Sequence, residues 1–174
     1  MVHFQIQPGL PPYGPPALCF PLPDAFREGL VVKFRAADGG SWVGNFAYGY
    51  GELSEVRAEL GAQTTIVVAK GAGYCVDVDR QLVREMAGPI DYIEYMEDVD
   101  LLIVANGLWF EAFGRSGPRW RTRRVSWDGM RSVSSVGGLI VGEAYSPMGP
   151  PDWHPFQLDT RTGEVTGGSY SGPE

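Results

Sequence analysis

Cysteine and histidine are scarce in this chain of 174 residues, which contains two of each. A secreted scaffold stapled by disulfides carries more cysteines, so Cys19 and Cys75 predict no such framework. Cys75 stands in an apolar, strand-like run, which favours a small buried hydrophobe. The sequence has no metal-site spacing of Cys or His, no Gly-x-Ser-x-Gly elbow and no phosphate-binding loop. We therefore predict no metal, no cofactor and no catalytic residue.

Long apolar runs and positive charge are also lacking. No stretch approaches the ~20 apolar residues that a membrane-spanning helix needs, and the N-terminus lacks the basic and apolar regions of a signal peptide. The chain has 14 Lys and Arg against 21 Asp and Glu, a formal charge of −7. This balance opposes contact with nucleic-acid phosphates and is compatible with a basic protein partner. We expect a cytoplasmic protein that binds neither membrane nor nucleic acid.

Proline is concentrated near the N-terminus, with seven prolines in residues 8–23. Such a density excludes a helix and a central strand, so the segment should be extended. It can be a recognition peptide for an SH3-like groove, or an arm that Tyr13, Leu18 and Phe20 hold against the domain. The apolar residues favour the second interpretation. We predict that residues 1–29 form this arm and that residues 30–174 form a single β-rich domain.

From residue 30 onward the pattern is that of short strands. The runs GLVVKF, TIVVAK, LLIVAN and LIVGEAY are β-branched and bounded by Gly, Asp or Asn, and other segments alternate apolar with polar residues. Glycine (24) and proline (14) are frequent enough for many turns. Residues 54–61 and 79–88 are short segments that fit either a helix or a strand. The chain is therefore predicted to be all-β or β-dominated, with one or two short helices at most.

The apolar runs recur at a nearly fixed interval. They begin at Leu30, Ile66, Leu102 and Leu139, with spacings of 36, 36 and 37 residues. A fixed period of this size is typical of stacked or radially arranged units, here antiparallel sheets. Alternatively, the interval reflects only the quasi-regular spacing of apolar strands that any all-β chain has.

The last copy, FQLDTRTGEVTGG, carries the most detail. Phe156 and Leu158 share one strand face and should be buried, Asp159 should accept backbone hydrogen bonds in the turn, and Gly163 should have positive φ. This apolar-x-apolar-Asp strand followed by Thr-Gly resembles the inner strands of β-propeller blades, particularly the quinoprotein-like repeats. The resemblance implies a propeller-like arrangement of small sheets.

Two regions are candidates for binding. The Gly-rich stretch at 40–51 holds four aromatic residues of one parity, which form either core or a binding face. Residues 115–131 hold six basic residues, and the acidic segment 91–100 can pair with them or leave them to an anion or an acidic partner. The candidate binding residues are Trp42, Phe46, Tyr48, Tyr50, Arg119, Arg121, Arg123, Trp127, Trp153 and His154.

Three functions remain open at this point. The first is a non-catalytic protein-interaction module, such as an immunity-type protein that neutralises a basic partner by charge complementarity. The second is a module that binds carbohydrate or another small ligand through the aromatic stretch. The third is a hydrolase that uses a carboxylate pair, for which Glu111 and Glu143 are the best candidates because both stand among apolar or aromatic neighbours.

Overall fold

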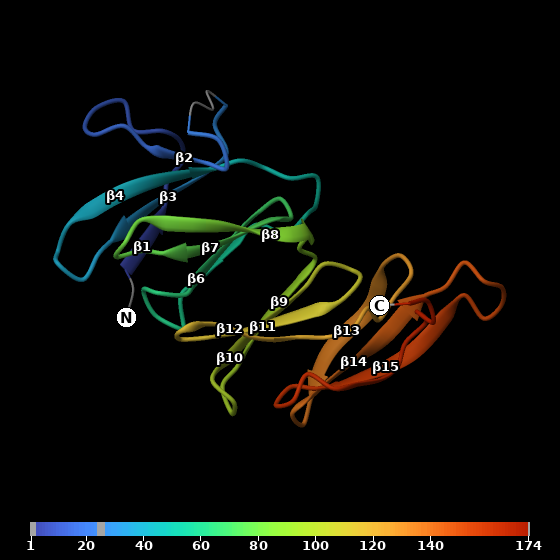
Figure 1. The fold of residues 1–174 in the computed structure, drawn as a ribbon. Helices are drawn as coiled ribbons and strands as arrows, with labels where there is room; N and C mark the ends of the chain where they lie inside the picture. The colour runs from blue at the N-terminus through green and yellow to red at the C-terminus, as the bar shows by residue number, and fades with distance from the viewer. Residues whose placement is uncertain (1–2, 24–26, 174) are drawn as a thin grey trace. The chain divides into compact units, whose positions relative to one another are not determined.

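The computed structural model describes residues 3–23 and 27–173 and contains sixteen strands (Figure 1). No helix occurs in these two ranges, and the fold is all-β, as the sequence predicts. Accordingly, none of the described residues forms a helix with the length and apolarity needed to cross a bilayer. The strands form four sheets of four strands each.

The chain divides into two compact units, residues 1–90 (unit 1) and 91–174 (unit 2), which are described separately below. Unit 1 contains two sheets. The first has the order β1-β3-β4-β2 and comprises β1 (His3–Ile6), β3 (Leu30–Arg35), β4 (Ser41–Phe46) and β2 (Leu18–Phe20). The second has the order β5-β6-β7-β8 and comprises β5 (Glu55–Arg57), β6 (Thr65–Ala69), β7 (Ala72–Asp77) and β8 (Leu82–Pro89).

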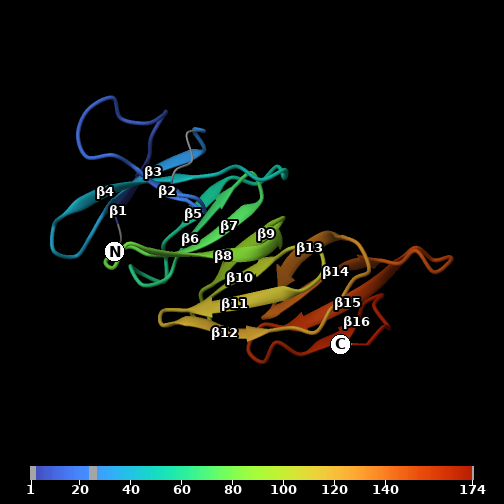
Figure 2. The same ribbon diagram turned by 45° about the horizontal axis from the view of Figure 1, so that its top comes forward.

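Unit 2 also contains two sheets, whose strands lie side by side in Figure 2. The third sheet, in the order β12-β11-β10-β9, comprises β12 (Gly117–Arg121), β11 (Phe110–Gly114), β10 (Leu101–Ala105) and β9 (Tyr92–Met96). The fourth, in the order β13-β14-β15-β16, comprises β13 (Met130–Val136), β14 (Leu139–Tyr145), β15 (Trp153–Asp159) and β16 (Val165–Gly167). All pairings in the four sheets are antiparallel except that of β2 with β4.

The 36-residue spacing corresponds to one strand in each sheet. The four apolar runs are β3, β6, β10 and β14, and each lies one place in from an edge of its sheet. Each of these strands is paired on both sides. β6 and β10 are buried at every position, which is why their sequences are apolar throughout, whereas β3 and β14 have exposed or half-buried positions. Four small, mostly antiparallel sheets are consistent with the propeller-like resemblance.

The two segments for which a helix was considered are strands. β5 lies within residues 54–61, and β8 occupies most of residues 79–88. Gly88 does not end a helix: it has a φ of +73° inside β8, where the pairing of β8 with β7 shifts register between Ala72 and Tyr74. Cross-strand pairing with β6 and β7 overrides the weak local helix preference of these short segments.

The core of unit 1 is rich in aromatic residues. Phe34 and Phe46 are fully buried, and Trp42 packs on Phe34 with ring centroids 4.7 Å apart. The Trp42 indole donates its N–H to the carbonyl oxygen of Val78 at 2.9 Å. This bond joins β4 to the segment that follows β7, so the two sheets of unit 1 share one core.

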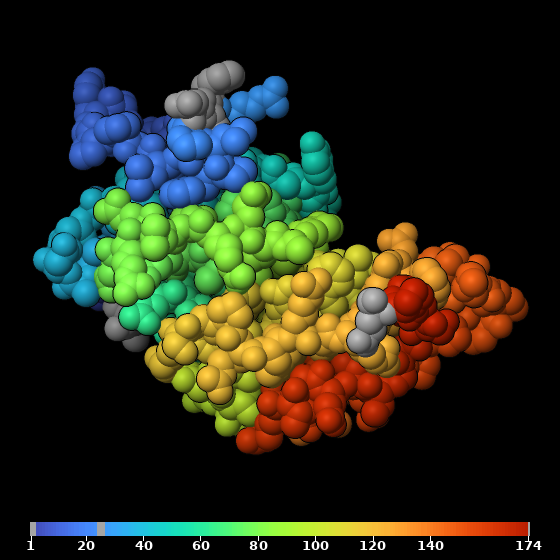
Figure 3. All heavy atoms as spheres, in the orientation of Figure 1, coloured from blue at the N-terminus to red at the C-terminus, as the bar shows by residue number. Residues whose placement is uncertain are grey.

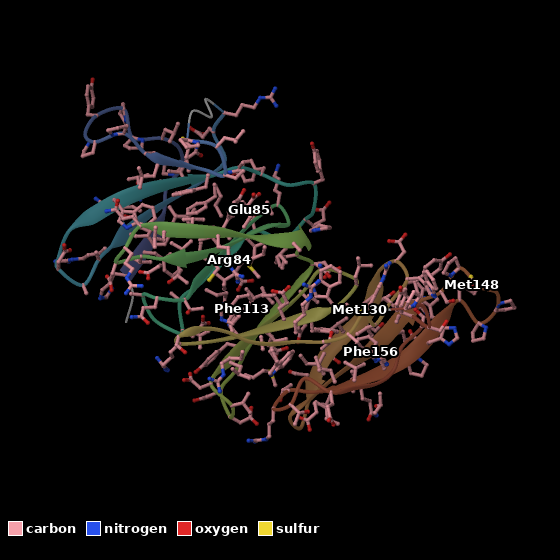
Figure 4. All side chains as sticks on the ribbon, in the orientation of Figure 1. Arg84, Glu85, Phe113, Met130, Met148 and Phe156 are labelled. Carbon is pink, nitrogen blue, oxygen red and sulfur yellow. The ribbon has the colours of Figure 1, made fainter. Side chains whose placement is uncertain are left out.

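The core of unit 2 joins its two sheets in the same way. Phe110 of β11 and Phe156 of β15 are buried with ring centroids 5.6 Å apart. Figure 4 shows Phe156 among the strands of this unit, whereas the exposed Met148 lies out on the β14–β15 loop. At the edge of the core, the Ser135 hydroxyl of β13 donates to Glu94 of β9 at 2.6 Å and links the sheets by a hydrogen bond.

The turn between β15 and β16 has the structure that its sequence predicts. The Asp159 carboxylate accepts hydrogen bonds from the backbone N–H of Arg161 (2.8 Å) and of Thr162 (3.1 Å). Gly163 has a φ of +77°, and Phe156 and Leu158 are buried. The alternation of this strand therefore serves to complete the core of unit 2.

Candidate functional site

A cavity of unit 1 lies between the proline-rich arm and the first sheet. It measures about 620 Å³. Seven of its eleven lining residues are apolar or aromatic: Pro11, Tyr13, Pro15, Pro16, Leu18, Trp42 and Val43. The polar ones are Gln7, Lys33, Ser41 and Gln81. A cavity of roughly 300–1,000 Å³ with an apolar wall and a few polar groups is typical of small-molecule sites.

The arm that closes this cavity is fixed at both ends. β1 pairs with β3 from His3–Arg35 to Ile6–Val32, and β2 pairs with β4. At the end of β2, the Phe20 ring stacks on Phe46 with centroids 5.4 Å apart. Figure 3 shows the blue atoms of the arm against the green atoms of the β7–β8 hairpin on this face of unit 1. Strand pairing and ring stacking within unit 1 therefore hold the arm over the first sheet.

The predicted aromatic stripe is divided between core and surface. Trp42 and Phe46 belong to the core, although Trp42 also contributes to the cavity wall. Tyr48 and Tyr50 are exposed because β4 ends at Phe46 and the alternation of faces ends with it. The Lys70 ammonium lies 4.9 Å from the centre of the Tyr48 ring, a cation–π contact at the end of the β6 strand.

The arginines of the basic segment lie on the solvent side, as strand alternation predicts. Arg119, Arg121 and Arg123 are exposed, whereas Thr122 is buried and bonds the backbone N–H of Phe110 at 3.0 Å. The Arg121 guanidinium stacks on Trp109, 3.9 Å from the ring centre. Arg119 and Arg123 form no ion pair with a described residue.

Three further candidate binding residues, from two segments of unit 2, lie near the C-terminal end of β14. Trp127 packs on Tyr170 with ring centroids 4.7 Å apart. Trp153 packs against Tyr145, and the Arg131 guanidinium lies 4.2 Å from the Trp153 ring centre. His154 stands opposite Ala144 in the sheet and is half-buried. The prediction that these residues bind a ligand or partner stays a prediction.

The two carboxylates proposed for a hydrolase are each held by an arginine. Glu111 lies 3.6 Å from Arg121, and Glu143 lies 2.9 Å from Arg131. The two residues pair directly across adjacent strands in each case. Each glutamate is therefore engaged by an arginine of the neighbouring strand.

Burial and hydrogen bonding shift the pKa of several tyrosines. Burial, with a smaller contribution from Glu85, raises the pKa of Tyr74 to about 12. Burial and a hydrogen bond to Glu94 raise the pKa of Tyr92. Within residues 3–23 and 27–173, no group of three or more His, Cys, Asp or Glu is arranged to hold a metal ion.

No family model matches this chain. No curated protein matches it either. A solved structure that it resembles is the crystal structure of puromycin hydrolase, with 17% sequence identity and a TM-score of 0.42. The match covers 79% of this chain and 24% of the other, so the chain spans about a quarter of that protein's length.

The prediction of a non-catalytic interaction module of the immunity type is wrong. The similarity found is to puromycin hydrolase and not to an immunity or interaction protein. The error came from inferring a neutralising role from the net charge and from the lack of catalytic motifs. The expectations of a basic partner and of a cytoplasmic location stay predictions.

Several residues of the cavity were not singled out as binding residues. Lys33 and Val43 stand opposite each other in β3 and β4 and face the arm. Tyr13 and Leu18 were expected to hold the arm, and they instead line the cavity, with Tyr13 largely exposed. The density of prolines before β2 was the sequence feature that could have indicated this cavity. Prolines make the segment rigid, so it does not follow the surface of the sheet closely and leaves space beneath it.

Proposed function

We propose that unit 1 binds a small apolar molecule with one anionic group in the cavity between the arm and the β3–β4 hairpin. The observation that carries this proposal is the apolar wall that the arm's Pro11, Tyr13, Pro15 and Leu18 form against Val43. Burying apolar ligand surface in such a cavity contributes about 25 cal/mol per Å².

We infer the anionic group of the ligand from the presence of Lys33 in the cavity. This lysine lines the cavity and forms no ion pair with a described residue. Its ammonium group can pair with a carboxylate, sulfonate or phosphate at the cavity mouth while its stem lies along apolar surface. The other polar lining groups, from Gln7, Ser41 and Gln81, are neutral, so a second charge on the ligand has no matching partner in the cavity.

Because strand pairing holds the arm at both ends, ordering it on binding costs little free energy. Proline lacks a backbone N–H and has a fixed φ, so the arm exposes few donors to an apolar ligand and has little freedom to lose. The backbone N–H of Leu10 also donates to Glu28 at 2.9 Å, which ties the arm loop to the segment before β3.

Two dyes of one skeleton test the proposal. N-phenyl-1-naphthylamine is neutral, and 1-anilinonaphthalene-8-sulfonate adds a sulfonate group. We expect saturable fluorescence enhancement with both dyes. Val43→Trp should fill the cavity and abolish both signals, whereas Val136→Trp, at an exposed position of unit 2, should leave them unchanged. Lys33→Met should weaken only the sulfonate dye, by about tenfold. Equal binding to the two tryptophan variants would contradict the proposal.

We further infer that the four sheets are blades of a propeller-type repeat of the quinoprotein-like kind. What supports this is the placement of one apolar run per sheet, at a constant interval, one strand in from the sheet edge. The Asp159–Gly163 turn, which has the Asp-x-x-Thr-Gly pattern of such repeats, is complete only in the fourth sheet.

A further inference from the structure

A second cavity, within unit 2, has a different chemical character. It is a groove of about 620 Å³ that opens beside the β9–β10 turn, β12 and the β15–β16 turn. Charged side chains of both signs line it, among them Glu97, Asp98, Asp100, Arg119 and Arg161. Its apolar wall includes Trp120. The cavity of unit 1 has no comparable mixture of charges.

Most of these charges are already paired. Asp98 lies 3.0 Å from Arg161, and Asp100 lies 2.7 Å from Arg115 and accepts a hydrogen bond from the Tyr95 hydroxyl. Glu97 and Arg119 differ, because neither forms an ion pair with a described residue. The groove therefore offers one uncommitted carboxylate and one uncommitted guanidinium group to a ligand.

Two glycines set the positions of the groove's wall. The stem of Arg119 lies across Gly114, where an added Cβ would come within 3.1 Å of its Cγ and Cδ. The Trp120 ring lies against Gly163, where an added Cβ would come within 2.8 Å of Cδ2. The Trp120 indole N–H is buried and has no acceptor among the described residues. Tight packing on both glycines restricts where Arg119 and Trp120 can move.

From this arrangement we infer that the groove binds a zwitterionic amino acid or short peptide with an apolar side chain. Arg119 binds the α-carboxylate, since a guanidinium group matches a carboxylate in geometry and charge. Glu97 binds the α-ammonium group. The apolar side chain lies along the wall that Trp120 forms with Leu101 and Pro118. A ligand with a single charge would leave one of the two groups without a partner.

Blocked peptides test the two charges separately. The probe is Leu-Phe, followed through the backbone and indole N–H resonances of the 15N-labelled full-length chain. We expect saturable shifts at Trp120 and the β9–β10 turn. N-acetylation or C-terminal amidation of the peptide should each weaken binding by about tenfold or more. Equal binding of the free and blocked peptides, or no shift with millimolar Leu-Phe, would overturn the inference.

Variants assign each charge to its partner. Glu97→Gln should weaken free Leu-Phe but not the N-acetylated peptide, and Arg119→Gln should weaken free Leu-Phe but not the amide. Glu164→Gln is the matched control, because Glu164 is exposed on the same unit and does not line the groove. All three changes are at exposed residues and should leave the spectrum of the folded chain intact. The assignment would be refuted if Glu97→Gln weakened binding of the N-acetylated peptide, or if Arg119→Gln weakened binding of the amidated peptide, as much as that of free Leu-Phe.

Discussion

A substitution at Gly163 should destabilise the protein in two ways, by a steric clash with Trp120 and by an unfavourable backbone conformation, and these two contributions can be measured separately. In Gly163→Ala the alanine would have to adopt a φ of +77°. Its Cβ would lie 2.8, 2.9 and 3.1 Å from the Trp120 atoms Cδ2, Cε3 and Cγ. The left-handed conformation costs a non-glycine residue about 1–2 kcal/mol. Overpacking against the half-buried indole adds about 1–3 kcal/mol.

Gly129 provides the matched control within the same unit. Its φ is +87°, and an added Cβ would have no atom within 4 Å. Gly129→Ala should therefore lose only the backbone contribution of about 1–2 kcal/mol. Both glycines lie in unit 2, so the two variants are compared within the same part of the chain.

Urea unfolding followed by circular dichroism, together with calorimetry, measures the difference. We expect Gly163→Ala to be less stable than Gly129→Ala by about 1–3 kcal/mol, or about 2–4 °C in Tm for each kcal/mol. Replacing Trp120 with leucine in the Gly163→Ala chain should recover that excess in a double-mutant cycle. Equal losses in the two alanine variants, or strict additivity with the Trp120 change, would refute the packing argument.

Three other predictions follow from burial and hydrogen bonding. Leu158→Ala should lower the free energy of unfolding by about 2–5 kcal/mol in urea titrations, because Leu158 is fully buried, whereas Leu82→Ala, at a largely exposed residue, should stay within about 1 kcal/mol. The hydrogen bond from Tyr95 and, after it, Arg115 lower the pKa of Asp100, so Tyr95→Phe should raise that pKa in a carbon-13 NMR titration. The stability that the Asp100 carboxylate contributes is present above its unfolded pKa and is lost as the pH falls through its folded pKa. An Asp100 pKa that is the same in Tyr95→Phe would contradict this prediction. The pKa of Tyr74 is raised to about 12, so the stability that this tyrosine contributes should be intact below its unfolded pKa of 10.0 and lost as the pH rises toward 12. Urea titrations between pH 10 and 12 should show this loss of stability, and Tyr74→Phe should remove it.

The sequence allowed the strand content to be predicted because strand signals are local. The run Leu102–Ala105 is apolar without interruption, and such a run requires cover on both faces. Alternation in Phe156–Asp159 and the Thr-Gly turn predicted both burial and the conformation of Gly163. The helix alternative for residues 79–88 was wrong because strand pairing depends on β7, which a local pattern does not include.

The candidate sites were harder to predict because each is assembled from segments distant in sequence. The cavity of unit 1 combines the arm with Lys33, Val43 and Gln81. The placement of the arm over these residues depends on the parallel pairing of β2 with β4, for which no sequence pattern is specific. In unit 2, strand alternation correctly placed Arg119 on the solvent side, but the groove beside it also needs Glu97 and Arg161 from two separate turns.

The most direct test of the unit 1 site is a set of intermolecular nuclear Overhauser effects with N-phenyl-1-naphthylamine bound to the methyl-labelled full-length chain. Both Leu18, from the arm, and Val43, from β4, line the cavity and carry methyl groups. The proposal predicts contacts from the dye's aromatic protons to the methyl groups of both residues. Contacts confined to residues outside 1–90, or to neither of these side chains, would contradict it.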